Sequence, residues 1–242
     1  QHGQLERIYR IAGRRRFLAR RGPCRTCRQS TSTVQVAIAY DDCFHGYFPD
    51  TLDLLELNGA AVCDFSPLRD ERLPPGTDVV YIGCGHPEWF ADELAANDCM
   101  LLALKSHLCG GRRMYVECGG LAYLCQQIEM PDSEFLPMAG VLPAQARLNL
   151  AAEAPTPSEI TLASDTWLGP AGASWRGYLN SRWTIEPHGY VESCAAEAGH
   201  EFDVLARHLA IGSRMHLNFA AQPNMLEHFF EPSKALAHVG VS

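Results

Sequence analysis

The sequence lacks several patterns that would place the protein in familiar classes. No apolar run approaches the roughly 18 residues of a membrane-spanning helix, so no membrane partner is predicted. The arginine-rich start is not followed by an apolar stretch, so we expect no secretory signal. The phosphate-binding pattern G-x-x-x-x-G-K-[ST] occurs nowhere, and we therefore expect that this chain does not bind ATP through a P-loop.

Paired cysteine motifs of the kind that bind zinc are also missing. The C-x-x-C spacing occurs once, at Cys24 and Cys27, and no second C-x-x-C or H-x-x-x-H accompanies it. Structural zinc sites use four ligands, so we expect no metal in the chain. The ten cysteines are spread along a long chain that is 47% hydrophobic, which favours a reduced, cytoplasmic protein over a small disulfide scaffold.

The sign of the net charge changes along the chain near Val34. Residues 1–33 hold nine arginines against one glutamate, and the whole chain carries −8, so residues 34–242 carry −16 (−8 less the +8 of the first segment). A basic arm can bind nucleic acid, but no aromatic interleaving or binding fold accompanies it, and the acidic body disfavours broad contact with a polyanion. We predict a basic N-terminal segment or linker (1–33), one large domain (34–242) and no nucleic-acid partner.

Apolar strands and helices alternate through the first half of this domain. Strands are predicted at 34–40, 61–67, 77–85 and 112–118, and helices at 49–60, 87–111 and 120–128. Residues 140–186 are richer in proline, glycine, serine and threonine and predict antiparallel edge strands at 159–164 and 181–187. Continuously apolar strands separated by helices indicate an α/β fold, in which helices cover both faces of a mainly parallel sheet.

Two of these strands end in glycine-rich turns, and one turn carries a thiol. The stretch MYVECGGLAYL (114–124) places Cys118 between a strand and a helix, where a helix N-terminus favours a thiolate. This is the arrangement of a nucleophile on a sharp strand-to-helix turn, and His216 downstream supplies a candidate base. The alternative interpretation is a buried cysteine beside an ordinary loop, with a histidine that serves only the core or the surface.

Five motifs occur in an order that resembles a known family. The family is the glutamine amidotransferase domain of cobyrinic acid a,c-diamide synthase, the type shared with cobyric acid synthase. Its members read roughly Y-x-P-G-G-Y-P-E, Y-x-E-C-G-G-L-x-Y-L, M-x-G-L-L-P, R-G-H-E and H-L-H-F. This chain has YIGCGHPE (81–88), YVECGGLAYL (115–124), MAGVLP (138–143), RGYL (176–179) and HLNF (216–219).

The resemblance implies a flavodoxin-like class I glutamine amidotransferase fold with a small antiparallel addition, and a thioester mechanism. Cys118 would attack the amide of glutamine, and His216 would pass the thiol proton to the leaving ammonia. Backbone N–H groups of Gly119 and of the turn around Gly85 would hold the oxyanion. Ammonia would pass to an ATP- and magnesium-dependent synthetase domain or subunit that activates tetrapyrrole carboxylates, and residues 1–33 are compatible with a remnant of its connection.

The chain departs from the family pattern around the expected site. Cys84 stands where the family usually has glycine, and its side chain could obstruct the oxyanion turn. His86 replaces an aromatic residue, and we expect it to border the glutamine pocket or to cap a loop. Asn218 stands where the family has histidine and is the candidate to orient His216. Arg176 is the candidate for contact with substrate or partner, against a surface ion pair.

Two main hypotheses of function follow from the sequence. The first is the glutamine-hydrolysing part of an ATP-dependent amidation of tetrapyrrole carboxylates. The second is an amidotransferase-like binding or assembly subunit with weakened catalysis, and a cysteine hydrolase for another amide is a third. The acidic residue beside the nucleophile, Glu117, is interpreted chiefly as a strand-end residue, and Phe44, Tyr47 and Phe48 as core packing.

Overall fold

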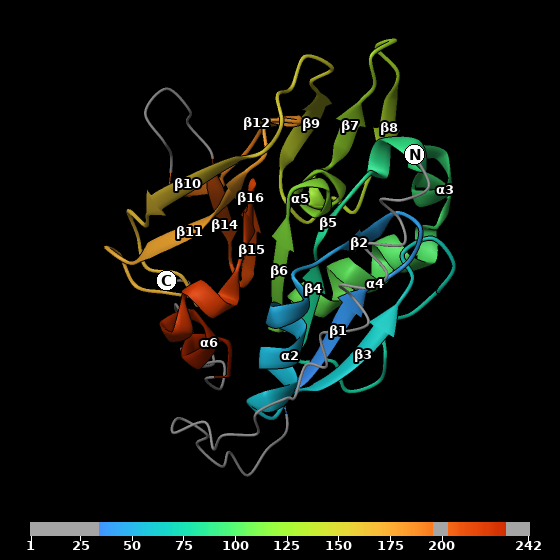
Figure 1. Cartoon of the computed structure of the whole chain (residues 1–242). Coiled ribbons are helices and arrows are strands. Elements are labelled where there is room, and N and C mark those ends of the chain that lie inside the picture. The colour runs from blue at the N-terminus through green and yellow to red at the C-terminus, as the bar shows by residue number, and fades with distance from the viewer. Residues whose placement is uncertain (1–33, 196–202, 231–242) are drawn as a thin grey trace, which may run out of the picture.

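The computed structural model describes residues 34–195 and 203–230 (Figure 1). The predicted basic segment 1–33, with the Cys24–Cys27 pair, lies outside the described residues. The predicted boundary near Val34 therefore stays a prediction.

A seven-stranded sheet forms the centre of the molecule (Figure 1). Its order is β13-β14-β15-β6-β4-β1-β3, in which β3, β1, β4, β6 and β15 run parallel to one another. Numbered along the chain, these parallel strands lie in the order 2-1-3-4-5, so the predicted flavodoxin-like α/β fold is confirmed. The bounds are β1 (Gln35–Ala39), β3 (Ala61–Phe65), β4 (Val79–Ile82), β6 (Arg113–Glu117), β13 (Glu192–Ala195), β14 (Val204–Arg207) and β15 (Ala210–Ser213).

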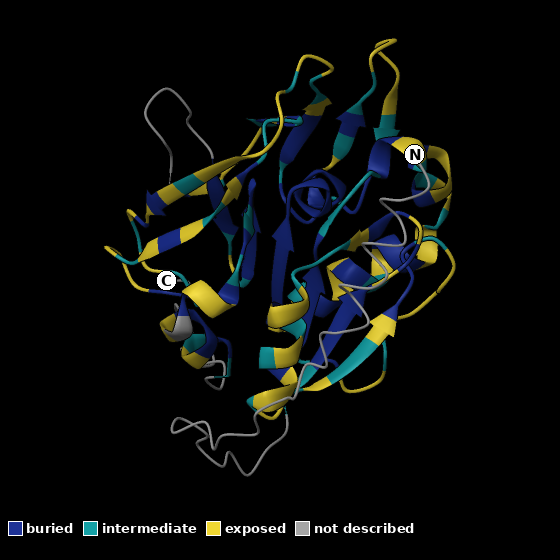
Figure 2. Ribbon diagram, in the orientation of Figure 1, coloured by how far each residue is buried: buried dark blue, intermediate teal, exposed yellow. Residues whose placement is uncertain are grey.

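Helices cover both faces of this sheet, and a core lies on each side. Along β4, Val80 packs into one core and Tyr81 into the other, as expected for a strand with alternating side chains. Figure 2 shows the central strands as buried, which explains their unbroken apolar sequences. One core takes side chains from α3 (Ala91–Ala96), α4 (Asp98–Cys109) and α5 (Gly119–Leu124), and the other from α2 (Pro49–Leu57) and α6 (Pro223–Phe230).

Three smaller sheets surround the carboxyl ends of the parallel strands (Figure 1). A three-stranded antiparallel sheet joins β10 (Thr156–Thr161), β11 (Ser174–Leu179) and β16 (Met215–Leu217). A four-stranded sheet joins β12 (Trp183–Pro187), β9 (Ala144–Leu148), β7 (Gln127–Glu129) and β8 (Phe135–Pro137). A two-stranded ribbon joins β2 (Phe44–Gly46) and β5 (Cys84–Gly85). The predicted antiparallel addition is therefore present, and it is larger than the sequence indicated.

Local sequence signals account for several element ends. Helix α2 begins with Pro49, which has no N–H to leave unsatisfied. It ends at Leu57, and its C-cap Asn58 is followed by Gly59 at φ 94°. The helix predicted over 120–128 is shorter: it ends at Leu124, and the segment after it pairs as β7. In the described parts of the chain, no helix combines the length and the apolar character needed to cross a membrane.

Candidate active site

Cys118 occupies a tight corner between β6 and α5. Its backbone has φ 50° and ψ −111°, which is rare for any residue other than glycine and marks a strained turn. The Cys118 amide donates to the Ser213 carbonyl of β15 at 2.8 Å, and this bond fixes the corner to the neighbouring strand. The predicted elbow is thus present at the carboxyl end of a parallel strand, where open α/β sheets bind ligands.

The two glycine-rich turns named in the sequence pack directly against each other. A side chain on Gly119 would overlap the Gly85 carbonyl, so the start of α5 can approach the β4–β5 turn only because residue 119 is glycine. The amide of His86 donates to the Cys43 carbonyl at 3.0 Å, so this amide is already used within the turn. Of the amides predicted to hold an oxyanion, that of Gly119 is beside the thiol.

The expectation of a free thiolate at Cys118 is wrong for this structure. Cys118 is 4% exposed, and its sulfur is bonded to the sulfur of Cys84 in a disulfide. Cys84 lies on β5, and its Cα is 5.0 Å from that of Cys118. Cys84, whose side chain was expected to obstruct the oxyanion turn, is therefore in contact with the candidate nucleophile Cys118.

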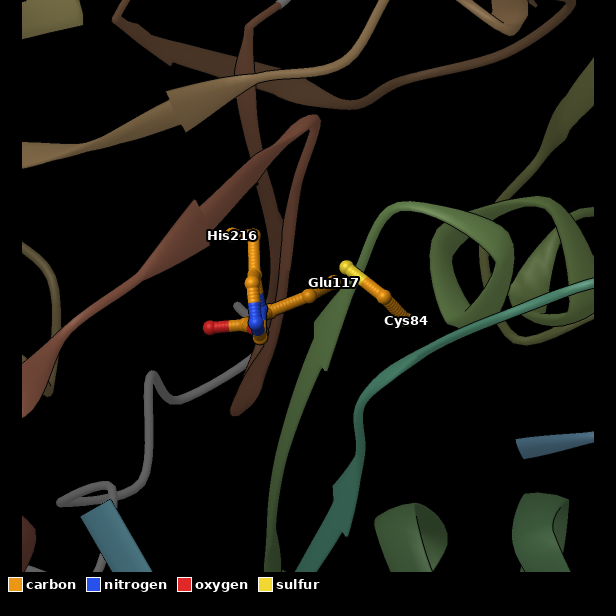
Figure 3. Close-up of side chains that lie close together, drawn as sticks. All are labelled: Cys84, Glu117 and His216. Atoms are coloured by element: carbon orange, nitrogen blue, oxygen red, sulfur yellow. The ribbon is translucent and has the colours of Figure 1, made fainter. Parts of the chain in front are cut away.

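His216 reaches the corner because the chain changes sheets just before it. Strand β15 pairs with β6 in the central sheet, and after Arg214 the chain continues as β16, which pairs with β11. Strand β16 therefore lies next to the carboxyl end of β6. Figure 3 shows the side chains of His216, Glu117 and Cys84 converging at this point.

Glu117 holds His216 in a defined orientation. Nδ1 of His216 lies 2.8 Å from Oε2 of Glu117, which is fully buried. The other carboxylate oxygen accepts from the Tyr115 hydroxyl at 2.7 Å and from the Leu217 amide at 3.1 Å. An ionised carboxylate can only accept a hydrogen bond, so Nδ1 of His216 must carry the proton that it donates. Nε2 is then left as the basic atom of the ring.

Asn218 is not the residue that orients His216. Its side-chain oxygen accepts from the Ala220 amide at 2.9 Å and caps a short 3₁₀ helix, Phe219–Ala221. The role expected for Asn218 is filled by Glu117. Glu117 ends a strand that is buried along its whole length, and a buried carboxylate requires partners; this was the signal that could have identified it.

Aromatic side chains support the imidazole from the other side. The ring of Phe48 stacks on His216 with centroids 4.0 Å apart and an interplanar angle of 11°. Phe48 was expected in the core; it is half-buried and belongs to the site. Tyr178 lies opposite His216 on β11, and its neighbour Gly177 lets the His216 backbone approach, since a Cβ there would overlap the His216 carbonyl.

The other aromatic residues of that cluster do pack inside. Phe44 is fully buried, and the Tyr47 hydroxyl donates to the Ala39 carbonyl at 2.5 Å and accepts from the Gly83 amide at 2.9 Å. Burial raises the pKa of Tyr47 well above its ordinary value, so this phenol stays protonated. Tyr47 therefore fixes the turn that carries Cys84.

A cavity of about 120 Å³ opens beside the sulfur pair. Arg182 lies at its wall and is bound to Glu88, with Nη2 2.6 Å and Nε 2.7 Å from Oε1. His86 also lines the cavity, 3.0 Å from the same oxygen, and stacks on Trp89. Oε2 of Glu88 is buried and has no hydrogen-bond partner among the described residues. The cavity is lined by His45, Gly46, Cys84, Gly85, His86, Gly119, Asn180, Arg182 and Trp183.

Arg176 stands apart from this cavity. Its side chain is 65% exposed on β11 and pairs with Glu159 on β10 at 3.0 Å. The structure therefore places it in a surface ion pair, the alternative that the sequence analysis left open. Arg182, which sequence reasoning did not single out, is the arginine beside the sulfur pair.

The site also offers atoms of the types that bind metals. The Cys84 sulfur, a Glu117 oxygen and a His216 nitrogen all lie within 4.8 Å of one another. Thiolate, imidazole and carboxylate ligands are suited to zinc. The expectation of a metal-free chain stays a prediction.

A cysteine on a strained corner, an oriented imidazole and a small cavity beside them are the parts that cysteine acyl transfer uses. Residues 35–222 match the family described as the CobB/CobQ-like glutamine amidotransferase domain. The chain belongs to this family. The resemblance and the enzyme class inferred from the sequence motifs are thereby confirmed.

Similar proteins in this family are cobyrinate a,c-diamide synthases. The enzyme of Syntrophotalea carbinolica is 37% identical over 145 residues, covering 60% of this chain and 32% of that protein. The enzyme of Dehalococcoides mccartyi strain 195 is 32% identical over 215 residues, covering 83% of this chain and 45% of that protein. The chain thus spans less than half the length of these relatives.

Solved structures agree with the amidotransferase fold. A crystal structure of a glutamine amidotransferase has a TM-score of 0.61 at 17% identity, covering 80% of this chain and 96% of that one. A chain in the structure of PurLQS from Thermotoga maritima also has a TM-score of 0.61, at 11% identity, covering 82% and 96%. At these identities the likeness concerns the fold alone.

Proposed function

We propose that this chain is the glutamine-hydrolysing part of an ATP-dependent amidation of tetrapyrrole carboxylates of the cobyrinate type. The observation that carries the proposal is the position of Cys118 on a strained corner beside the Glu117–His216 pair. A nucleophile, a base and a group that orients the base are the parts that acyl transfer requires. Membership of the amidotransferase family names glutamine as the amide.

The chemistry follows from the atoms of the reduced site. The Cys118 sulfur attacks the side-chain amide carbon of glutamine, while Nε2 of His216 takes the thiol proton and then gives it to the leaving ammonia. Glu117 keeps Nδ1 protonated and stabilises the positive charge that the ring acquires in this step. Water, activated by the same Nε2, then hydrolyses the glutamyl thioester to glutamate and frees the thiol.

The negative charge on the amide oxygen needs hydrogen-bond donors. The Gly119 N–H directly follows the nucleophile and belongs to the first residue of α5, whose N–H has no partner within the helix. We assign it the role of oxyanion donor. Gly85 contributes by letting the β4–β5 turn lie against this amide.

To bind free glutamine, the site needs a cationic group for the α-carboxylate and an anionic group for the α-ammonium. The half-buried Arg182 lines the cavity beside the sulfurs and is paired with Glu88, which is buried behind the cavity wall. We assign Arg182 to the α-carboxylate and the unpartnered Oε2 of Glu88 to the α-ammonium group. Both contacts require the pair to adjust when glutamine enters, and His86 remains to hold the shared oxygen of Glu88.

The acceptor and the energy source lie outside this chain in the proposal. The relatives named cobyrinate a,c-diamide synthase are more than twice as long as the segment matched here. We propose that a synthetase domain or subunit uses ATP and magnesium to activate the acceptor carboxylate and receives ammonia from this domain. The acceptor within the tetrapyrrole class is set by that partner.

Glutamate release from glutamine by the reduced protein tests the proposal. The protein is treated with a dithiol reductant and assayed alone and with a related synthetase domain, next to Cys118→Ala and Cys99→Ala. We expect glutamate formation that Cys118→Ala lowers by at least about 10³-fold and that exposed Cys99→Ala leaves unchanged. Equal rates for Cys118→Ala and the unaltered protein would refute the proposed nucleophile.

One observation favours a second candidate, an amidotransferase-like binding or assembly subunit. The Cys84 side chain lies against the candidate nucleophile in a turn that must be open for an oxyanion. If the fully reduced protein binds the synthetase and yet neither releases glutamate nor reacts with glutamine analogues, this second function replaces the first.

A further inference from the structure

Cys84 and Cys118 are placed for direct chemistry with each other. Their Cα atoms lie 5.0 Å apart, within the range of roughly 4.4–6.8 Å that disulfides require. The two residues come from β5 and from the corner after β6, which the interlocking glycine turns hold together. The backbone of the site thus accommodates the bond between the sulfurs.

Their surroundings differ from those of two other buried cysteines. The Cys84 sulfur lies within 4.8 Å of a ring nitrogen of His216, a base that can take a thiol proton. Cys43 and Cys125 are buried in the core, and burial raises the pKa of both thiols well above the ordinary value. Oxidation should therefore favour the pair over these two thiols.

The pair is also accessible from one side. Cys118 is buried, whereas Cys84 is half-buried and lines the cavity of about 120 Å³. A small oxidant or thiol can enter by the space that glutamine would occupy. We therefore expect glutamine to protect the pair.

We propose that Cys84 and Cys118 form a reversible redox site, at which a peroxide-class oxidant blocks the nucleophile and a thiol reductant restores it. The inference rests on the proposed function in one respect, that Cys118 is the nucleophile. Cys84 acts as the resolving cysteine. It makes the activity of this chain responsive to oxidant, and glycine at its position would remove the response.

The chemistry balances with hydrogen peroxide as the oxidant. The Cys118 thiolate attacks one peroxide oxygen, a sulfur–oxygen bond forms, the oxygen–oxygen bond breaks, and the departing hydroxide is protonated to water. The Cys84 thiolate then attacks the Cys118 sulfenic sulfur, the disulfide forms, and hydroxide leaves and is protonated to a second water. Two thiols have lost two electrons and two protons, and the peroxide has gained them.

Reduction follows by exchange at the accessible sulfur. An external thiolate attacks the Cys84 sulfur, and Cys118 leaves as a thiolate. A second thiol attacks the mixed disulfide on Cys84 and releases the free thiol. The external pair is oxidised, and both cysteines are again reduced.

Metal binding by the same atoms is the competing explanation for this cluster. Glu117 uses one oxygen for the Tyr115 hydroxyl and the Leu217 amide, and the other for His216. In the disulfide the Cys84 sulfur is bonded to Cys118 and is not a thiolate ligand, and the three bonds of Glu117 stay intact. The contacts therefore favour oxidation, and the test includes a chelator throughout.

Peptide mass spectrometry and thiol alkylation test the site without relying on glutaminase activity. The whole chain is reduced, freed of reductant in the presence of a chelator, and treated with hydrogen peroxide with and without glutamine. The matched variants are Cys84→Ala and, as a control at an exposed cysteine on α4, Cys99→Ala.

We expect a Cys84–Cys118 linked peptide in the unaltered protein and in Cys99→Ala, and a fall of at least about tenfold in alkylation of Cys118 that dithiothreitol reverses. In Cys84→Ala, Cys118 should instead proceed to sulfinic acid, which dithiothreitol does not reverse. Glutamine should slow the linkage. Failure of the linked peptide to form, or reversible oxidation of Cys118 without Cys84, would overturn the proposal.

Glutamate release, measured on the same samples, separates the two proposals. Loss of activity on linkage and recovery on reduction support both. Reversible linkage in a protein that never releases glutamate would contradict the proposed function and leave the redox site established.

Discussion

Glu117 and His216 are separated by 99 positions in the sequence, and their side chains meet at 2.8 Å. Glu117 ends the central strand β6, whereas His216 belongs to β16 in a different sheet. The contact exists because the chain leaves the central sheet at Arg214 and crosses the end of β6. The residue just before the candidate nucleophile thus orients the candidate base.

The first prediction concerns the residue that orients His216. Replacing Glu117 by glutamine keeps its volume but removes the charge that stabilises the protonated imidazole. We expect kcat for glutamine hydrolysis to fall by on the order of 10²- to 10⁴-fold, with KM little changed. Steady-state kinetics of the reduced protein, with circular dichroism to verify folding, make the measurement.

Asn218→Ala is the matched control for this prediction. The Asn218 side chain caps the 3₁₀ helix after β16, whereas the carboxylate that bonds to the His216 ring is that of Glu117. We expect its removal to change kcat by less than about threefold while lowering stability by about 1 kcal/mol. A larger loss of kcat from Asn218→Ala than from Glu117→Gln would assign the orienting role to Asn218 instead.

The second prediction separates two arginines. Arg182 lies at the cavity wall, so Arg182→Gln should raise KM for glutamine by at least about tenfold, since a charged hydrogen bond contributes roughly 1.5–3 kcal/mol. Arg176→Gln should leave KM within about twofold, because an exposed ion pair contributes little and lies outside the cavity.

Lysine at position 182 provides a further comparison. Arg182→Lys keeps the positive charge near Glu88 but loses the two-nitrogen contact with its carboxylate. We expect an intermediate KM. If Arg176→Gln raised KM more than either Arg182 variant did, the glutamine site would have to be moved to the β10–β11 side of the molecule.

The third prediction concerns acid stability. Burial lowers the pKa of His107 to about 4, and its Nε2 lies 3.0 Å from the Arg113 carbonyl. In the unfolded chain the pKa is about 6.5. Between those values the unfolded state binds a proton that the folded state does not, so the free energy of unfolding falls as pH drops from about 6.5 to about 4.

His107→Gln removes this titration and keeps an N–H donor for the Arg113 carbonyl. Urea unfolding at about pH 7.5 and about pH 5 should show a smaller loss of stability in His107→Gln than in the unaltered protein, by roughly 1–2 kcal/mol. His45→Gln, at an exposed histidine, should behave like the unaltered protein. Identical acid sensitivity in all three proteins would rule out His107 as the cause.

Sequence periodicity was sufficient to predict the central fold. The predicted strands 34–40, 61–67, 77–85 and 112–118 contain β1, β3, β4 and β6. The inner strands β1, β4 and β6 are apolar because both of their faces are buried, whereas β3 lies at the sheet edge and is partly exposed. The short strands were harder to predict from the sequence. β7 overlaps the end of the predicted helix 120–128, since three residues are too few to establish a period.

The candidate site was predictable where the local chain determines it. The Cys118 corner is set by a strand, two glycines and a helix that are adjacent in sequence. The Glu117–His216 contact and the Cys84–Cys118 bond depend on how distant segments cross, and pattern alone does not specify such crossings. The sequence accordingly named Cys84 as unusual but did not predict its bond to Cys118.

Labelling with a diazoketone analogue of glutamine is the measurement that shows whether Cys118 is the nucleophile of a glutamine site. The protein is reduced, treated with the analogue with and without excess glutamine, and examined by intact and peptide mass spectrometry beside Cys118→Ala. We expect one adduct, on Cys118, which glutamine suppresses and Cys118→Ala abolishes. An adduct on another residue, or no adduct in folded, reduced protein bound to its synthetase partner, would contradict it.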